Sequence, residues 1–425
     1  MNLVKFSAIV LFTVAPHLFA ADFGAQKYGW SETASRDFQD YYIRTLNKKS
    51  AIINDFWLHY WLQQELLKLN IRSPNPVGLT ETVILKDSTI NAYALPGNII
   101  AIYAGLIQTS ASEDELASVL AHEMSHIALD HFTRITQNSE SQALKILAGM
   151  ALAVVLAQES SEAANAALFS TLASTQQNRL NFSQGMEVEA DQLAQQILQQ
   201  TDYDDGAGAR FFLKLYAEHG GQEAYEYLRS HPLGTTRASK LAGKASGDEQ
   251  PPSTFYRFMK AYLSYLKNGK FNAVNFSMHE EKLNDPDWQF AIWMNQHLKS
   301  SLTPDITALQ KLIRQYPSYL PAQFALLKYS ANESDRYCEQ LQGFEQQLGK
   351  RSITLDVLDL LAEQSSKCIS VSAVQWQAQR YWQSGKEKQA IAYLNQQISQ
   401  SPDTNQTARL NNQLELYTRR YDRFR

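Results

Sequence analysis

The spacing of hydrophobic residues changes several times along the chain, and each change predicts a different element. From Gln26 to Asn70 apolar side chains recur at i, i+3 and i+4, which predicts one or two helices packed on a core. Two β-branched runs, ETVILKD (81–87) and NIIAIYAGL (98–106), predict neighbouring strands. The segment between them, NAYALPG (91–97), ends in a Pro-Gly pair typical of a turn. We therefore expect a small sheet beside helices.

A further helix is predicted to begin at SASEDEL (110–116). Ser112 and Glu115 have the spacing of a capping box, and an acidic first turn suits the helix dipole. An apolar, alanine-rich run follows from Leu144 to Ala157. It is shorter than the roughly 18 residues of a membrane span. Its length allows a buried helix or a helix that lies on a membrane surface.

From about Thr254 the pattern becomes one of paired amphipathic helices with short loops. The stretch WQAQRYWQSGKEKQAIAYLNQQISQSPD (376–403) matches a tetratricopeptide repeat, with Gly385 and Ala390 at the helix crossing and Pro402 at its end. A weaker match runs from Ala261 to Pro286, and Pro317 is placed to end another repeat. A helical bundle is the alternative reading. Repeat solenoids usually bind partners on a concave surface.

Length and composition indicate more than one domain in an ordinary globular chain. The chain has 425 residues, 44% of them hydrophobic and 19% charged, with a net charge of −4, which excludes a basic nucleic-acid-binding protein. Residues 1–20 are predicted to be a signal peptide, because Lys5 precedes an apolar run and a small-residue site ends at Ala20. In an oxidising compartment Cys338 and Cys368 would form a disulfide; two buried thiols are the alternative.

Three histidines lie within ten residues of the segment SVLAHEMSHIALDHF (118–132). His122 and His126 are four residues apart on the predicted helix, so both imidazoles reach one ion. Glu123 lies beside that ion, where a carboxylate can take a proton from metal-bound water. This H-E-x-x-H pattern predicts a catalytic zinc site. His131 is five residues beyond His126, about 140° around a continuous helix. We reject it as a ligand and expect it to end the helix or to bond a carbonyl there.

Catalytic zinc requires a third protein ligand. The segment NFSQGMEVEADQLAQQIL (181–198) supplies Glu187 and Asp191 on one helical face. One of these carboxylates can complete a His₂Glu set while the other orients a ligand histidine. Glu189 points elsewhere and is expected to be solvated.

Three separated motifs, NAYALPG, HEMSH and EVEAD, resemble those of a family of zinc metalloproteases. The family includes the CAAX prenyl endopeptidases, HtpX and the periplasmic β-barrel assembly-enhancing proteases, and the resemblance extends to about residue 245. The repeat-like tail after a signal peptide narrows it to the BepA-like subgroup. In this family the glutamate of E-x-x-A-D ligates zinc. The resemblance therefore implies that Glu187 is the zinc ligand and that Asp191 orients a ligand histidine.

The same resemblance draws attention to His231 in YLRSHPLGTTRASKL (227–241). It matches a histidine that can approach the metal and displace the catalytic water, acting as a latch. A loop histidine before Pro232 is the alternative. The chain departs from the family at Gln184, where an arginine is usual, so any charge role at that position is in doubt.

These patterns predict a mainly helical α+β chain with three parts: the signal peptide (1–20), a zincin-like metalloprotease domain with a small β-sheet (21–250) and an all-α tetratricopeptide-type solenoid (251–425). A substrate would add to one of the two strands flanking Pro96 and Gly97, unless both strands serve only as core, which is the alternative. The expected activity is that of a periplasmic endopeptidase with one Zn²⁺ per chain, His122, His126 and Glu187 as ligands, and Glu123, Asp191 and His231 at the catalytic centre.

The resemblance implies as substrates misfolded outer-membrane β-barrel proteins, reached through the barrel assembly machinery. In such a protease the apolar run from Leu144 to Ala157 would be a lid over the cleft, which we favour, or a segment that touches the membrane. The alternative function is a chaperone or assembly scaffold whose zinc site stays closed by His231.

Overall fold

The computed structural model describes residues 32–78, 80–136, 176–218, 227–228, 231, 237, 239–240, 243, 251–276, 284–300, 303–330, 335–349, 353–368, 372–401 and 404–424. The predicted signal peptide and the apolar run from Leu144 to Ala157 lie outside these residues. Among the described helices, none is both long and apolar enough to cross a membrane.

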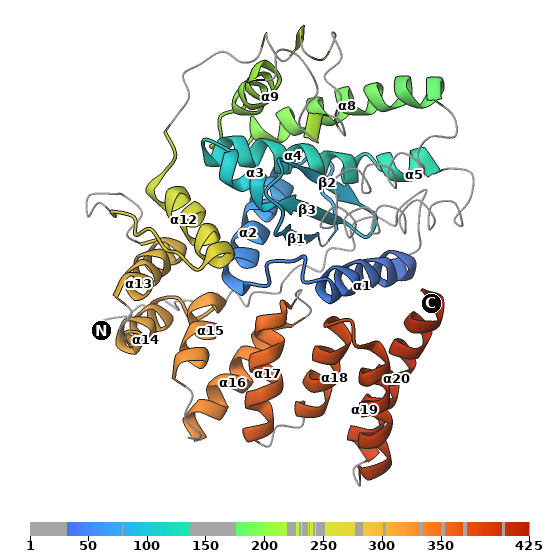
Figure 1. Cartoon of the computed structure of the whole chain (residues 1–425), viewed down its shortest axis with the longest axis vertical. Helices are drawn as coiled ribbons and strands as arrows, with labels where there is room; N and C mark the ends of the chain where they lie inside the picture. The colour runs from blue at the N-terminus through green and yellow to red at the C-terminus, as the bar shows by residue number, and fades with distance from the viewer. Residues whose placement is uncertain are drawn as a thin grey trace, which may run out of the picture.

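The first part of the chain contains a three-stranded sheet and the helices around it (Figure 1). Its elements are α1 (Glu32–Lys48), α2 (Phe56–Arg72), β1 (Glu81–Leu85), β2 (Ala92–Leu95), β3 (Ile99–Tyr103), α3 (Ala104–Thr109), α4 (Glu113–Ala128), α5 (His131–Thr136), α8 (Gln176–Leu198) and α9 (Ala207–Glu218). The predicted helical region up to Asn70 is two helices, and the two predicted strands are confirmed as β1 and β3. The segment NAYALPG was expected only to turn the chain, yet it also contains β2.

The strand order is β1-β3-β2, with β3 parallel to β1 and antiparallel to β2. Since β3 is paired on both sides, only β1 and β2 lie at edges. The outer edge of β1 is partly covered by a bridge between Ile52 and Leu85. At the turn between β2 and β3, Gly97 has a φ of +82°, and a Cβ there would lie 2.7 Å from the Ser35 carbonyl oxygen of α1. Glycine is therefore required for this close approach.

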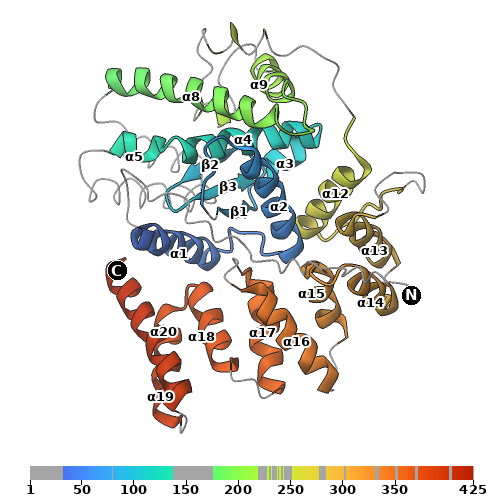
Figure 2. The same cartoon turned by 180° about the vertical axis from the view of Figure 1, so that it is seen from behind.

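The sheet buries both faces, as its continuous apolar strands require. Alternate residues of β3 point to opposite sides. Ile99, Ala101 and Tyr103 pack against α1, whereas Ile100 and Ile102 join the larger core that contains α2 and α4. The sheet thus separates α1 from α2 and α4, and α8 packs on the far side of α4 (Figures 1 and 2).

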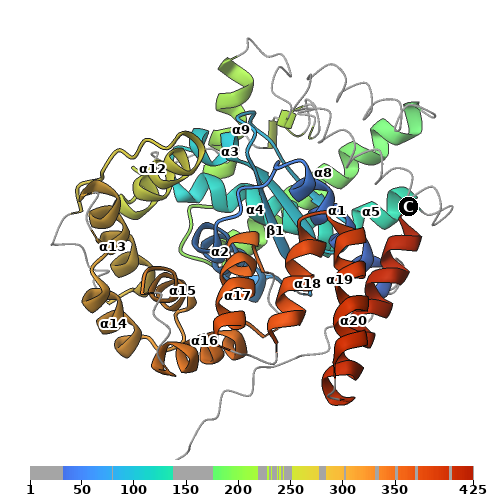
Figure 3. The ribbon, with the colours of Figure 1, turned by 60° about the horizontal axis from the view of Figure 1, so that its bottom comes forward.

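The rest of the chain is helical and curves around the first part (Figure 3). Its helices are α12 (Thr254–Asn268), α13 (Pro286–Ser300), α14 (Ile306–Gln315), α15 (Leu320–Tyr329), α16 (Asp335–Leu348), α17 (Leu355–Lys367), α18 (Ala373–Gln383), α19 (Glu387–Gln400) and α20 (Thr404–Arg423). The predicted repeat at 376–403 corresponds to the pair α18 and α19, with Gly385 at φ +70° between them. Pro286 was expected to close a repeat but instead begins α13. A proline at the start of a helix loses no intrahelical hydrogen bond.

Helix α2 is shared between the two parts. Trp57 contacts Phe258, Tyr262 and Phe290 of α12 and α13, with ring centroids 4.7–5.6 Å apart. Phe56 packs in the same way on Phe324 and Phe344. The core that contains α2 and α4 therefore continues into α12–α15 without a break.

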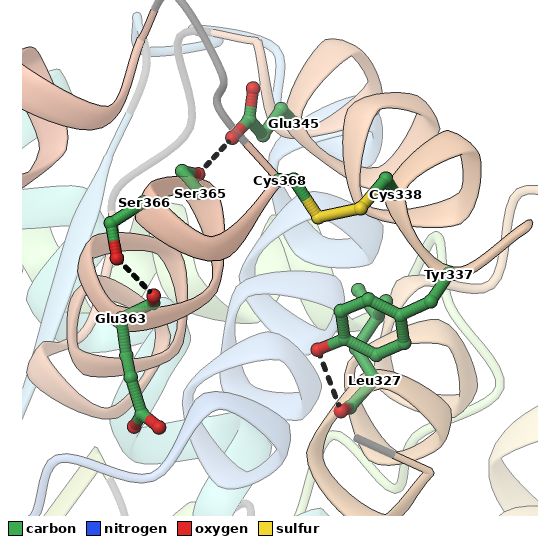
Figure 4. The surroundings of a disulfide bond; sticks show 8 residues. All are labelled: Leu327, Tyr337, Cys338, Glu345, Glu363, Ser365, Ser366 and Cys368. Carbon is green, nitrogen blue, oxygen red and sulfur yellow. Dashed lines mark hydrogen bonds between the residues drawn. A yellow bond between two sulfur atoms is a disulfide. The ribbon is translucent and has the colours of Figure 1, made fainter. Parts of the chain in front are cut away.

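Cys338 and Cys368 form a disulfide between α16 and the end of α17 (Figure 4). The sulfur atoms are 2.01 Å apart and the Cα atoms 5.5 Å apart. The expected pairing of the two cysteines is confirmed, and it closes a loop of 30 residues.

A pair of aspartates joins α2 to α17. Asp55 caps α2 by accepting from Leu58 N, and its other oxygen accepts from the Tyr262 hydroxyl at 2.6 Å. Asp356 accepts from Phe56 N at 3.0 Å. Burial, together with the neighbouring Asp55 carboxylate, raises the pKa of Asp356 to about 7.

We expect Asp356→Asn to flatten the dependence of stability on pH. A folded-state pKa above the ordinary value means that the native chain holds a proton that the unfolded chain releases, so stability falls as pH rises from about 4 to 7. The amide imitates the protonated carboxyl and should raise the free energy of unfolding at pH 8 by about 1–2 kcal/mol. Urea unfolding at several pH values measures this effect. Asp359→Asn, an exposed site on the same helix, is the control; an equal gain there would contradict the assignment.

Candidate metal centre

Helix α4 supplies the first two side chains of the site. The Ser112 hydroxyl accepts from Glu115 N, and the Glu115 carboxylate accepts from Ala111 N, so the predicted cap is present in a slightly shifted form. The helix places His122 and His126 one turn apart, with their Nε2 atoms 3.0 Å from each other. His122 is 2% exposed. The two rings therefore converge on one point inside the protein.

Helix α8 brings a carboxylate to the same point. Glu187 is 4% exposed, and its two oxygens lie 3.3 Å from His122 Nε2 and 3.5 Å from His126 Nε2. Burial opposes its charge, but His231 and hydrogen bonds from His122 and His231 hold the pKa of Glu187 well below its usual value. The carboxylate is thus ionised despite its burial.

His231 completes the cluster. Its Nδ1 lies 3.0 Å from Glu187 Oε2 and 3.3 Å from His122 Nε2, and the residue is 6% exposed. One ligand atom from each of His122, His126, Glu187 and His231 lies within 4.8 Å of the others. His231 was expected to lie either near the metal or in a loop away from it. The structure places it within the group of candidate ligands.

The arrangement of donors and acceptors fits a cation. His122 Nδ1 lies 3.0 Å from the Asp191 carboxylate, which can only accept, so this nitrogen carries the hydrogen. In the neutral ring Nε2 then presents its lone pair to the Glu187 carboxylate, which can also only accept. Such a buried set is unfavourable by itself, and the ring without a metal takes up a proton instead: burial lowers its basicity, but Asp191 and Glu187 raise the pKa of His122 to about 9. Two or three imidazoles with one carboxylate are a typical donor set for zinc.

Arg237 makes hydrogen bonds to several residues around the cluster. Its Nε and Nη2 donate to the two oxygens of Asp191 at 2.7 and 3.0 Å, and its Nη1 donates to the His231 carbonyl at 2.9 Å. Nη1 also lies 3.1 Å from Glu187. Burial raises the pKa of Asp191, but His122 and next Arg237 hold it at about 2. The guanidinium thus links the segment that carries His231 to the helix that carries Glu187.

Glu123 lies beside the cluster without belonging to it. Its Oε1 is 3.3 Å from His231 Nε2 and 3.5 Å from the Tyr227 hydroxyl. Glu123 is fully buried. Burial, and next the Glu123 charge, raise the pKa of Tyr227 well above 10, so the hydroxyl stays a donor. This geometry suits a carboxylate that handles protons next to a metal ion.

Two expectations about neighbouring residues need correction. His131 does not bond a carbonyl: α4 ends at Ala128, His131 begins α5, and its Nδ1 lies 2.9 Å from His126 Nδ1. Glu189 is only partly solvated, because it pairs with His131 and Arg134. Gln184 is exposed on α8.

Sequence reasoning did not assign Arg237 or Tyr227. His231 N donates to the Tyr227 carbonyl at 2.9 Å, and the rings of the two residues lie 4.8 Å apart between centroids. A spacing of four residues between an aromatic hydroxyl and a candidate ligand was the signal for Tyr227. Arg237 is 46 residues from Asp191 and has no comparable local signal.

Comparison with known proteins agrees with this chemistry. Residues 57–245 match the model of peptidase family M48. The chain is 31% identical over 248 residues to the β-barrel assembly-enhancing protease of Escherichia coli (strain K12), a region that is 58% of this chain and 50% of that protein.

More distant relatives match shorter regions. Identity is 30% over 217 residues to the putative β-barrel assembly-enhancing protease of Vibrio cholerae, covering 51% of this chain and 44% of that protein. It is 27% over 198 residues to the mitochondrial metalloendopeptidase OMA1 of Arabidopsis thaliana, covering 46% and 38%. The chain spans about half the length of the β-barrel assembly-enhancing proteases that it matches.

We expect Glu187→Ala to weaken zinc binding at least 100-fold, because it removes the one negatively charged ligand of the cluster. Competition with a chromogenic chelator measures the affinity. Gln184→Ala, an exposed substitution on the same helix, should bind zinc like the unmodified chain. Unchanged affinity in Glu187→Ala would remove this residue from the site.

Proposed function

We propose that the chain is a zinc-dependent endopeptidase, and the match of residues 57–245 to the model of peptidase family M48 supports this proposal. The observation that carries the proposal is the convergence of His122, His126 and Glu187 beside the buried carboxylate of Glu123. A purely structural metal site would have no use for that additional carboxylate.

In this proposal His122, His126 and Glu187 hold the metal. Bound zinc supplies a Lewis acid that polarises the scissile carbonyl and acidifies water. Glu123 takes the proton of the attacking water and passes it to the leaving amine. Asp191 keeps the hydrogen of His122 on Nδ1, so that Nε2 faces the metal.

His231 acts as a latch in this proposal. Its Nδ1 lies among the ligand atoms while its Nε2 lies 3.3 Å from Glu123. A histidine in this position competes with water for the metal and occupies the proton acceptor at the same time. Cleavage would therefore require the segment around His231 to withdraw.

The substrate would bind as an added strand on β2. Of the strands on either side of Pro96 and Gly97, β3 is paired on both sides, whereas β2 pairs with β3 alone in the described sheet. Helix α4 packs against β2, so a peptide at this edge would lie near the metal ligands. Tyr227 N donates to the Ile90 carbonyl just before β2, at 3.3 Å. The segment that leads to His231 thus begins at the same edge.

The helices from α12 to α20 would form the partner-binding domain, built as a tetratricopeptide-type solenoid and bounded near residue 250. The pair α18 and α19 is the best support for repeats of this type. The names of the bacterial relatives support a role in β-barrel assembly. We propose misfolded outer-membrane β-barrel proteins as substrates, the barrel assembly machinery as partner, and the periplasm as location. The run from Leu144 to Ala157 would be a lid or a peripheral membrane contact.

The alternative function is an assembly scaffold whose zinc site stays closed. The observation that favours it is the position of His231, which lies among the candidate ligand atoms and close to Glu123. The two functions differ in their dependence on Glu123: a scaffold keeps its biological effect when Glu123 is replaced by Gln, and a protease loses it.

The test is degradation of a purified, misfolded outer-membrane barrel protein by the zinc-loaded chain and two variants. Glu123→Gln should lose at least 100-fold in rate, as expected for the loss of a general base. His231→Ala should cleave faster than the unmodified chain, because the latch is gone. His297→Ala, on α13 and outside the metal cluster, is the control.

Absence of cleavage by the unmodified chain and by His231→Ala would contradict the endopeptidase and favour the scaffold. Equal rates for these two proteins would contradict the latch alone.

A further inference from the structure

The third histidine of the segment 118–132 has a place in the structure that the proposed mechanism does not use. His131 is a buried residue, with 3% of its side chain exposed, and it contacts one of the candidate metal ligands. Its Nδ1 lies 2.9 Å from His126 Nδ1, the nitrogen of His126 that faces away from the metal position. This contact is the counterpart of the one between Asp191 and His122.

A break in the helix makes the contact possible. On a continuous helix His131 would lie about 140° away from His126. Helix α4 ends at Ala128, and Asp130 takes a φ of +52°. Aspartate tolerates this left-handed conformation better than most residues. This break changes the direction in which the next side chain points, and His131, the first residue of α5, lies beside His126.

The second ring nitrogen of His131 contacts a carboxylate of helix α8. His131 Nε2 lies 3.2 Å from Glu189 Oε2. Arg134 donates to both oxygens of the same carboxylate, which keeps it ionised. An ionised carboxylate only accepts, so His131 Nε2 carries a hydrogen. The neutral ring then has its lone pair on Nδ1, and His126 must donate from its own Nδ1. The lone pair of His126 Nε2 is left to face Glu187 and His122.

The opposite arrangement is incompatible with metal binding. If His131 donated to His126, the hydrogen of a neutral His126 would sit on Nε2 and point into the ligand cluster. We therefore infer that His131 is a positioning residue for the metal centre: through Glu189 and Arg134 it fixes the ring orientation and tautomer of His126. The inference rests on the proposed metal site and adds a second outer support, separate from that of Asp191 and Arg237.

The test measures metal binding rather than proteolysis. Removal of such outer partners typically weakens metal affinity 10- to 100-fold. We expect His131→Ala to lose affinity for zinc in this range by chelator competition, and to change the visible absorption bands of the Co²⁺-substituted chain. His131→Asn places Oδ1 close to the position of the lost Nδ1, so it should recover most of the affinity and the original bands. His297→Ala, which removes a histidine outside the cluster, should change neither.

Circular dichroism and thermal unfolding of the metal-free proteins show whether each variant folds. If His131→Ala does not fold, Glu189→Ala takes its place, because the Glu189 side chain is 43% exposed and its removal leaves the core intact. It should lower zinc affinity and shift the Co²⁺ bands in the same direction.

Unchanged zinc affinity and Co²⁺ bands in the folded variant would overturn the inference. Equal losses in His131→Ala and His131→Asn would also overturn it, because they would point to packing rather than to the hydrogen bond. A chain that binds zinc and cleaves nothing would contradict the endopeptidase while leaving this test valid.

Discussion

The arrangement of the first part of the chain depends on one buried charge, the carboxylate of Glu187. An ionised carboxylate taken out of water costs several kcal/mol unless other groups compensate. Here His122, His126, His231 and Arg237 surround it. These side chains come from helices α4 and α8 and from the segment after α9, so their convergence fixes how those pieces pack. Apolar side chains of similar size would hold the same helices together at lower cost. The retention of so many polar groups is therefore explained by binding a cation.

The elements behind α4 keep this cluster rigid. The sheet presents one apolar face to α2 and α4 and the other to α1, so α4 lies on a surface that is itself packed from behind. Charged contacts extend the support to the end of the chain. Asp40 of α1 accepts from Trp382, and Arg44 pairs with Glu387. Because α1 and α2 both contact the C-terminal helices, a partner that displaced those helices would disturb the support of α4 as well.

The sequence predicted a feature correctly where the spacing of nearby residues was enough to determine it. Four residues between His122 and His126 predicted two ligands on one helix, and the spacing of Ser112 and Glu115 predicted where that helix starts. Glu187 could be separated from Asp191 only by resemblance to a family, since both share a helical face. Strand β2 was missed because it is four residues long and lies in a segment dominated by its turn signal. The contact of His131 with His126 could not be predicted, because it depends on a break in the helix at the left-handed residue Asp130.

The outer supports of the two ligand histidines differ in what they are attached to, and this difference bears on the proposed latch. His122 is held by Asp191, which is held by Arg237, and Arg237 also binds the carbonyl of His231. His126 is held by His131, Glu189 and Arg134, none of which contacts His231 in the described structure. Withdrawal of His231 would therefore strain the support of His122 through Arg237 while leaving His126 in place. In the proposed latch, opening would thus be opposed by a charge-assisted hydrogen bond as well as by the loss of a metal ligand, and a partner that opened the site would have to overcome both.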